Sequence, residues 1–466
     1  MAARTKPDAL TPEVLEQLNE ATHRALLASF AGGVAVGVTD RRRTLAVLLL
    51  GHADIAAGSP LRPQTLFEIG SISKGFAAIC VLQAQAEGLV DVHQPVTRAL
   101  PWFSVRSWFE PIAPHHLMSH TGGIILGSDI TDDALFEVWS LRDTQAGTPP
   151  GTYFHYSNVG YKALGLMLEA VEGRPFPEIL RRRVLAPLGM RASEPAITHA
   201  VRHRLAVGYV PAYDDRPPRR SDGLAPAPWL ESDAADGSIC SSADDMARYL
   251  RLLLNGGRAP SGRLLSSADF EAMTTGVIDS DEELGGRYGY GIERLSMGGR
   301  EYLAHTGGMV GYHSAMLLDP DAGLGVVVMG SGLGKWWELS IHVLATVRAT
   351  LGGEPLPELE LPVAAAEPEH EPDEEPPAQW RPLVGHYRAR NPWLSNFHVR
   401  VRGGRLWMIH YGDEFAPAPL VPVGDGVFRI GHDERSPERL RFDVMVDGVA
   451  VRATYSGCPY YRTFTP

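Results

Sequence analysis

The spacing of apolar residues predicts a mixture of helices and antiparallel strands over roughly the first three quarters of the chain. A helix start at Thr11-Pro12 is followed by apolar residues at helical spacing to about Phe30. Two apolar runs then predict a hairpin, and a later series of strands precedes a last helix. These elements are Gly33–Val38, Thr44–Leu50, Tyr288–Ile292, Tyr302–Thr306, His313–Leu318, Leu324–Met329 and the helix Lys335–Leu351.

The same pattern divides the chain into a large domain, a linker and a small β domain. Residues from about 95 to 230 are rich in helix and loop signals, so strands and helices from both ends of region 1–352 enclose a mostly helical insertion. Residues 353–379 are dominated by Pro and Glu and predict an extended linker. Residues 380–466 contain three hairpins with turn glycines, which predict a small antiparallel barrel. The expected fold class is α+β with an appended barrel.

The composition of the chain limits the kinds of molecule that it is expected to bind. The chain has 466 residues and a formal charge of −12, which argues against nucleic acid or an anionic membrane. Its three cysteines lie in no metal or redox spacing, and residues 1–20 lack the apolar core of a secretory signal. We therefore expect a soluble, cytoplasmic protein with reduced thiols.

The stretch Phe67–Phe76 carries the clearest chemical signal. Ser71 and Lys74 are three residues apart at a predicted helix start, so their side chains share one face. A serine nucleophile needs a nearby base, and an amine can act as one where a guanidinium cannot. Only four of the 43 basic residues are Lys, which makes a Lys at this position more telling.

Two further motifs offer groups that this pair could use. Tyr156-x-Asn158 provides a phenol for proton relay and an amide that can orient Lys74 or bind a substrate carbonyl. Tyr and Asn at this spacing are common, however, so the motif alone is weak.

The segment His305-Thr306-Gly307-Gly308 lies between apolar strands. Its two glycines would let a ligand backbone approach an edge strand, and the Gly308 and Ser71 N–H groups would form an oxyanion hole. We expect His305 to titrate near neutral pH.

A second His-Thr-Gly-Gly occurs at His120, which we interpret as fixing a loop. His115, His116 and His120 have no acidic or Cys partner at useful spacing, so no metal site is predicted.

The three motifs, in this order, closely resemble those of the serine β-lactamase and penicillin-binding-protein superfamily, in its class C β-lactamase and D,D-peptidase branch. The resemblance covers about residues 15–352. It implies that Ser71 is the acylated nucleophile and that Lys74 and Tyr156 share general-base and general-acid work. Asn158 would position the substrate, while residues 305–308 would bind its backbone. Which of Lys74, Tyr156 and His305 holds the proton at each step stays open.

His305 stands where β-lactamases usually have Lys, which removes a fixed cation for a β-lactam carboxylate. His at this position is familiar from the esterase, peptidase and acyltransferase branches. The whole chain looks like penicillin-binding-protein-type thioesterases, stand-alone cyclases with a lipocalin-like C-terminal domain. That resemblance implies a peptidyl thioester on a carrier protein, a cyclic peptide product and no cofactor. It also makes Arg462 a candidate for binding peptide carbonyls.

Two alternatives remain at this point. One is a cytosolic serine esterase or D-amino-acid-specific peptidase or amidase of the same superfamily. The other is a catalytically inactive binding module, which the presence of Ser71, Lys74 and Tyr156 disfavours. The peptide's identity and the oligomeric state are not predicted.

Overall fold

The computed structural model describes residues 10–127, 133–213, 216, 218–281, 285–358, 374–410 and 416–463. The chain separates into two compact units, each assembled from three segments. The first unit comprises Met1–His93, Leu164–Val210 and Leu224–Ala365, and the second comprises Gln94–Ala163, Pro211–Gly223 and Ala366–Pro466.

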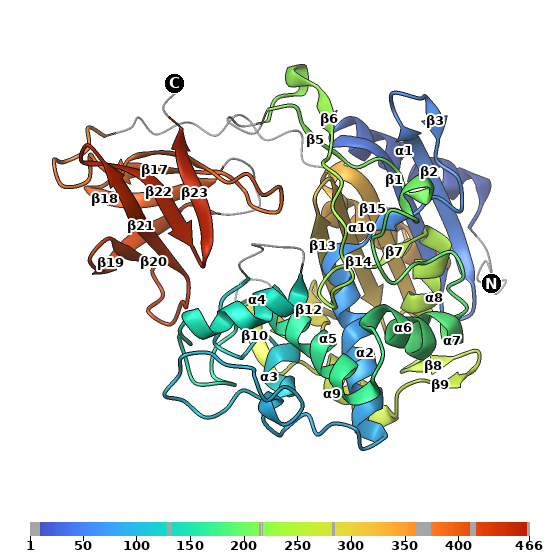
Figure 1. The fold of residues 1–466 in the computed structure, drawn as a ribbon. Helices are drawn as coiled ribbons and strands as arrows, with labels where there is room; N and C mark the ends of the chain where they lie inside the picture. Colours follow the sequence, from blue (N-terminus) through green and yellow to red (C-terminus); the bar gives the residue numbers. More distant parts are fainter. Residues whose placement is uncertain are drawn as a thin grey trace. The chain divides into compact units, whose positions relative to one another are not determined.

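The first unit is built on a nine-stranded antiparallel sheet (Figure 1). The strand order is β10-β11-β12-β13-β14-β15-β1-β2-β3, so strands from both ends of the unit are neighbours. The strands are β1 (Phe30–Asp40), β2 (Thr44–Asp54), β3 (Ser59–Pro60), β10 (Ile278–Asp281), β11 (Gly286–Tyr288), β12 (Glu293–Met297), β13 (Arg300–Met309), β14 (Tyr312–Asp319) and β15 (Leu324–Leu333). The predicted antiparallel sheet flanked by helices is confirmed.

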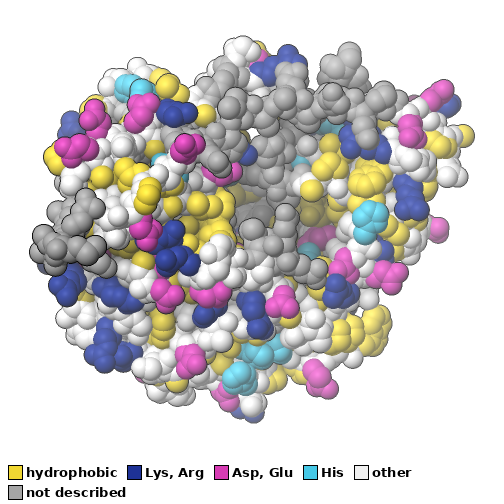
Figure 2. Space-filling model, turned by 180° about the vertical axis from the view of Figure 1, so that it is seen from behind, with side chains coloured by type: hydrophobic (Ala, Val, Ile, Leu, Met, Phe, Trp, Pro, Cys, Tyr) yellow, Lys and Arg dark blue, Asp and Glu magenta, His cyan; other side chains and the backbone are white. Residues whose placement is uncertain are grey.

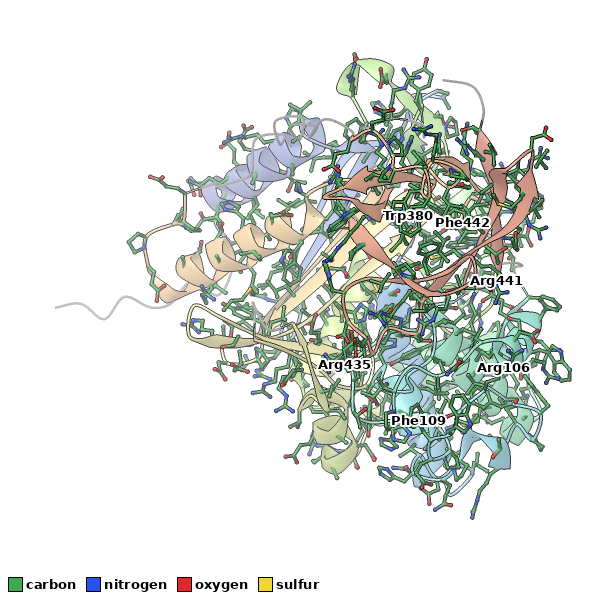
Figure 3. The ribbon with its side chains drawn as sticks, turned by 90° about the vertical axis from the view of Figure 1, so that its left-hand side faces the viewer. Arg106, Phe109, Trp380, Arg435, Arg441 and Phe442 are labelled. Atoms are coloured by element: carbon green, nitrogen blue, oxygen red, sulfur yellow. The ribbon has the colours of Figure 1, made fainter. Side chains whose placement is uncertain are left out.

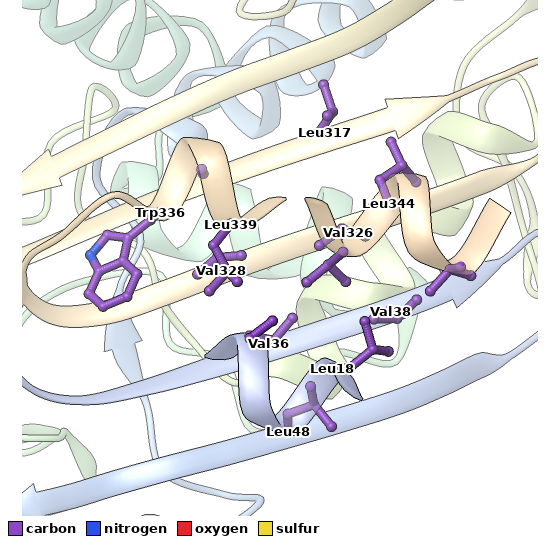
Figure 4. Packing of buried hydrophobic residues seen from close by; sticks show 14 of the residues in the cluster. Leu18, Val36, Val38, Leu48, Leu317, Val326, Val328, Trp336, Leu339 and Leu344 are labelled. Atoms are coloured by element: carbon purple, nitrogen blue, oxygen red, sulfur yellow. The ribbon is translucent and has the colours of Figure 1, made fainter. Parts of the chain in front are cut away.

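Helices α1 (Pro12–Leu27) and α10 (Trp336–Gly352) pack on one face of this sheet. Figure 4 shows their buried side chains meeting alternate residues of β1 and β15. Burying one such side chain contributes about 1.5–3 kcal/mol. Trp336 needs a glycine opposite it, because a Cβ on Gly330 would lie 2.4 Å from its ring.

Helix α8 (Ala243–Leu254) covers the opposite face. Val36 and Val38 of β1 belong to the core under α1 and α10, so the intervening Gly37 points the other way. A Cβ there would lie 2.7 Å from the Ala243 carbonyl oxygen, which shows how closely α8 approaches. The Ser242 hydroxyl accepts a hydrogen bond from the Asp245 N–H and caps the helix.

Most of the other strands and α-helices of the first unit are short, apart from α2, the helix that follows Ser71. They are β4 (Phe67–Glu68), α2 (Ser73–Ala86), α6 (Phe176–Leu180), α7 (Ala186–Leu188), β7 (Cys240–Ser241), β8 (Arg258–Ala259), β9 (Gly262–Arg263), α9 (Ser267–Thr274) and β6 (Leu224–Pro226), which pairs with β5 (Tyr209–Pro211).

One predicted strand is wrong. Tyr288 ends β11, and the next four residues form a turn before β12. The Gly289 N–H donates to the Ile292 carbonyl, and Gly291 has a φ of +67°. Two glycines therefore override the alternating apolar pattern that suggested a strand.

The second unit combines a helical region with a closed eight-stranded barrel. The helices are α3 (Pro114–Met118), α4 (Ala134–Ser140) and the start of α5 (Asn158–Glu172). The barrel strands are β16 (Gly385–Arg388), β17 (Phe397–Arg402), β18 (Arg405–His410), β19 (Ala418–Gly424), β20 (Val427–Ile430), β21 (Arg439–Val446), β22 (Val449–Tyr455) and β23 (Cys458–Thr463).

The barrel interior is filled by side chains at alternate strand positions. β17 follows this rule through Phe397, Val399 and Val401, which are buried, whereas the residues between them are half-buried. The ring centres of Phe428 and Phe442 lie 5.6 Å apart inside the barrel, and the Trp380 ring packs edge-on against Phe428. The predicted closed antiparallel barrel is confirmed. Residues 359–373 of the predicted linker lie outside the described residues, and the boundaries at 352 and 380 stay predictions.

Candidate active site

Gly70–Ile72 form a 3-10 turn that runs directly into α2. We call it the nucleophile turn, because it carries the predicted nucleophile Ser71. In a 3-10 turn, residues three apart lie directly above one another. The Lys74 Nζ accordingly donates a hydrogen bond to the Ser71 Oγ at 2.8 Å. Ser71 is half-buried, whereas Lys74 is fully buried. The sequence-predicted pair is therefore in contact, with its serine partly open to solvent.

Backbone groups from distant segments hold Lys74 in place. Its Nζ also donates to the Asp236 carbonyl oxygen at 2.8 Å. The turn that was predicted as a strand packs on the same point, because a Cβ on Gly291 would lie 2.6 Å from the Lys74 carbonyl carbon. Beyond it, the Phe76 and Tyr249 rings stack with centroids 3.8 Å apart. Lys74 thus sits on a helix end with little room to move.

Strand β13 lies against the nucleophile turn. A Cβ on Gly70 would lie 2.7 Å from the Gly308 nitrogen, and one on Gly307 would lie 2.0 Å from the Ile69 oxygen. The Ser314 hydroxyl donates to the Ile69 carbonyl at 2.8 Å and ties β14 to the same turn. Only glycines permit this approach, which explains their positions in the motif.

The end of β13 extends beyond the last residue that pairs with β12. The last pair between β12 and β13 joins Glu293 to Ala304, so later β13 residues lie past the end of β12. Met309 and Tyr312 close the hairpin with β14, and the alternation of an antiparallel ladder then directs the Gly308 N–H away from β14. Thr306 and Gly308 are exposed. The oxyanion hole formed by the Gly308 and Ser71 N–H groups stays a prediction.

His305 is buried and has partners on both ring nitrogens. Its Nδ1 lies 2.5 Å from the Thr306 carbonyl oxygen, and its Nε2 lies 2.7 Å from the Tyr288 hydroxyl. A carbonyl can only accept, so Nδ1 carries a hydrogen, and in the neutral ring Nε2 then accepts from the Tyr288 hydroxyl. Burial, together with the charge of Lys74, lowers the pKa of His305 to about 4. The expectation that His305 titrates near neutral pH is therefore wrong: it is a neutral side chain.

Tyr156 and Asn158 belong to the second unit, where a histidine fixes their loop. The His120 Nδ1 accepts the Ser157 N–H at 3.0 Å, and its ring lies 4.1 Å from the Tyr156 ring. Asn158 starts α5, and its N–H donates to the Leu126 carbonyl at 2.6 Å. These contacts agree with the loop-fixing interpretation of His120. The pairing of Tyr156 and Asn158 with Ser71 and Lys74 stays a prediction.

Arg462 lies in β23 of the barrel and pairs with Tyr387. Its guanidinium donates to the Pro382 carbonyl at 3.2 Å, so one carbonyl that it binds belongs to its own chain. Its proposed contact with peptide carbonyls stays a prediction.

Sequence reasoning missed three side chains that contact or neighbour candidate site residues within their own unit. Tyr288 fixes the His305 ring, Glu438 of the barrel contacts the loops around Tyr156, and Glu68 lies just before the nucleophile turn. Glu68 pairs with Cys240 between β4 and β7, and burial raises its pKa to about 8. The one sign of Glu68 in the sequence is that this acidic residue interrupts an apolar run.

Within the described ranges, no group of His, Cys, Asp and Glu side chains could hold a metal ion. No helix in that part of the chain is long and apolar enough to cross a membrane. On the face shown in Figure 2, the Lys and Arg side chains that are drawn alternate with Asp and Glu. That face therefore lacks the continuous basic field that marks nucleic-acid binding.

Comparison with known proteins gives matches over most of the chain. The family model described as Beta-lactamase matches residues 21–339. Penicillin-binding protein 4 of Amycolatopsis lactamdurans is 27% identical over 326 residues, which cover 67% of this chain and 84% of that protein. Esterase EstB of Burkholderia gladioli is 30% identical over 300 residues, which cover 58% of this chain and 72% of the esterase.

Two solved structures share the fold. The octameric penicillin-binding protein homologue from Pyrococcus abyssi has a TM-score of 0.62 at 22% identity and covers 97% of this chain and 99% of its own. The D-stereospecific amidohydrolase from a Streptomyces species has a TM-score of 0.58 at 24% identity and covers 70% of this chain and 98% of its own. At these identities the likeness is one of fold.

Proposed function

Because the chain belongs to the beta-lactamase family, we propose that Ser71 is acylated by a peptidyl thioester and releases it as a head-to-tail cyclic peptide. At the coarser level, the chain is a serine hydrolase of the β-lactamase and penicillin-binding-protein type. The finer proposal concerns which acyl donor reaches Ser71 and which nucleophile removes the acyl group.

The burial of His305, with a partner on each ring nitrogen, is the observation that carries the choice of donor. A lysine at this position would offer a cation to a substrate carboxylate. His305 instead donates one N–H to a backbone carbonyl and accepts from Tyr288, and its pKa of about 4 keeps it uncharged. This strand therefore favours an acyl donor without a free carboxylate beside the scissile bond. Esters, thioesters and amides meet that condition.

The reaction would then follow the usual course of acyl transfer. The Ser71 oxygen attacks the thioester carbonyl while Lys74 or Tyr156 takes its proton, and the carbon–sulfur bond breaks to release a thiol. The proton taken from Ser71 leaves with the thiol. The N-terminal amine of the same peptide attacks the new ester. An amide bond then forms and the ester bond breaks, while the proton lost by the amine restores the Ser71 hydroxyl. Cyclisation depends on holding the amine close and keeping water away.

The architecture supports a cyclase through its resemblance to penicillin-binding-protein-type thioesterases. A β-lactamase-like catalytic domain is followed by a small closed barrel in this chain. By that resemblance the peptide would arrive on a carrier protein, with a D-residue at its C-terminus.

A second candidate is hydrolysis of an ester or of a D-amino-acid amide. One relative is named as an esterase, and one structure of the same fold is named as a D-stereospecific amidohydrolase. Both activities would use the same acyl-enzyme at Ser71, with water in place of the amine.

The test is mass spectrometry of products from synthetic peptide thioesters that differ in an L- or D-residue at the C-terminus. We expect a product one water lighter than the linear acid, dependent on a D-terminus and absent with Ser71→Ala. Linear acid as the sole product would assign the second candidate. A wild-type enzyme that forms no adduct at Ser71 with a fluorophosphonate would contradict both.

A further inference from the structure

We propose that Glu438 of the barrel is a positioning residue for the Tyr156-x-Asn158 motif, and this inference rests on the proposed function. Glu438 lies at the end of the loop between β20 and β21, which we call the barrel loop (residues 431–438). It belongs to the same compact unit as the motif. The barrel would then be part of the catalytic machinery.

The Glu438 carboxylate joins the helical region to the barrel. Its Oε1 accepts the Leu126 N–H at 2.7 Å and lies 3.0 Å from the His155 Nε2. Its Oε2 accepts a hydrogen bond from the Ser456 hydroxyl in the turn between β22 and β23. One carboxylate thus binds partners from both sides, 312 and 18 residues away in sequence.

These partners hold the motif at both of its ends. The Leu126 carbonyl accepts the N–H groups of Asn158 at 2.6 Å and Val159 at 3.2 Å, which are the first two residues of α5. His155 directly precedes Tyr156, and its N–H donates to the His120 carbonyl at 2.8 Å. Glu438 therefore holds Leu126, whose carbonyl receives the first N–H groups of α5, and His155, the residue just before the phenol.

The same loop makes two further contacts with this region. The Arg435 guanidinium, labelled in Figure 3, lies 4.1 Å from the centre of the Tyr153 ring. A Cβ on Gly147 would lie 2.3 Å from the Arg435 carbonyl oxygen. The barrel loop therefore fits closely against the loops that carry Tyr156.

Glu438 is suited to this task because its charge is buried and satisfied. It is 5% exposed. Burial alone would raise its pKa, but hydrogen bonds with His155, Ser456 and Leu126 outweigh that effect and hold the pKa below its usual value. Charge-assisted hydrogen bonds are about twice as strong as neutral ones, which makes Glu438 a firm anchor.

The experiment measures labelling of Ser71 by a fluorophosphonate in the full-length chain. The end-point amplitude gives the fraction of folded, active sites, and the rate constant gives the reactivity of each site. We expect Glu438→Ala to lower the rate constant about 10- to 100-fold and Glu438→Gln about 3- to 10-fold. Glu434→Ala, which removes an exposed acid from the same loop, should label at the wild-type rate.

A purely structural role would give a different result, with a lower amplitude and an unchanged rate constant per labelled site. That result in both Glu438 variants would overturn the inference, and Glu438→Gln decides the matter if Glu438→Ala does not fold. Gly147→Ala should also slow labelling, because its methyl group displaces the barrel loop and leaves the carboxylate intact. Failure of the wild-type chain to label at Ser71 would instead refute the proposed function.

Discussion

The buried Glu68 gives a prediction about stability that has a definite pH window. The side chain lies in β4, three residues before the nucleophile, and burial raises its pKa from 4.5 to about 8. At neutral pH the folded protein therefore keeps it protonated, whereas the unfolded chain releases the proton. Glu68→Gln should mimic the protonated form and cannot ionise.

The magnitude follows from the difference in pKa between the two states. Because the folded pKa is raised, the contribution of Glu68 is fully present below about pH 4.5 and is lost as the pH rises through about 8. One pKa unit corresponds to about 1.4 kcal/mol, so the loss over this window is about 5 kcal/mol. Above about pH 8 the Glu68 carboxyl is ionised in both the folded and the unfolded state, so the free energy of unfolding no longer falls as the pH rises.

The assay is urea unfolding at half-unit steps from pH 5 to pH 8.5. Wild type and Glu68→Gln should have similar free energies of unfolding near pH 5. Near pH 8 the variant should be more stable than wild type by several kcal/mol. Glu16→Gln, at an exposed position on α1, is the matched control and should track wild type throughout. Parallel pH profiles for wild type and Glu68→Gln would refute the assignment of a neutral, buried carboxyl.

The other predictions concern Lys74, the partner of Ser71, and Tyr288, the partner of His305. Lys74→Arg keeps the charge but removes the base, so labelling of Ser71 should slow by about 10²–10⁴-fold, while the same exchange at Lys335 should have no effect. Tyr288→Phe removes the donor to the buried His305 Nε2 and should lower the free energy of unfolding by about 1–3 kcal/mol in urea titrations. Loss of stability no greater than that of Tyr290→Phe would contradict this role for Tyr288.

Local chemistry was the part of the site that the sequence could predict. The Ser71 and Lys74 contact depends on a spacing of three residues, and the glycines of β13 mark a close approach whatever the partner is. The barrel followed from three hairpins with turn glycines. The Ser71–Lys74 contact and hairpins of the barrel such as β17–β18 each lie within a short window of sequence.

The parts that could not be predicted depend on partners far apart in the chain. Leu126 and Glu438 are 312 residues apart, and nothing near either residue announces the other. The turn after Tyr288 was misjudged because its apolar pattern suits a strand, while its packing against Lys74 comes from tertiary structure. His305 was expected to titrate near pH 7 because its burial is invisible in sequence.

The scarcity of lysine has a consequence for an enzyme that handles activated acyl groups. Thioesters acylate accessible amines without a catalyst, whereas a guanidinium stays protonated and does not react. Lys74 is fully buried, and Lys162 is 8% exposed and paired with Glu137. Of the lysines that the structure describes, this leaves Lys335, which is half-buried. With the proposed thioester as acyl donor, a surface of arginines would therefore protect the protein from being modified by that donor.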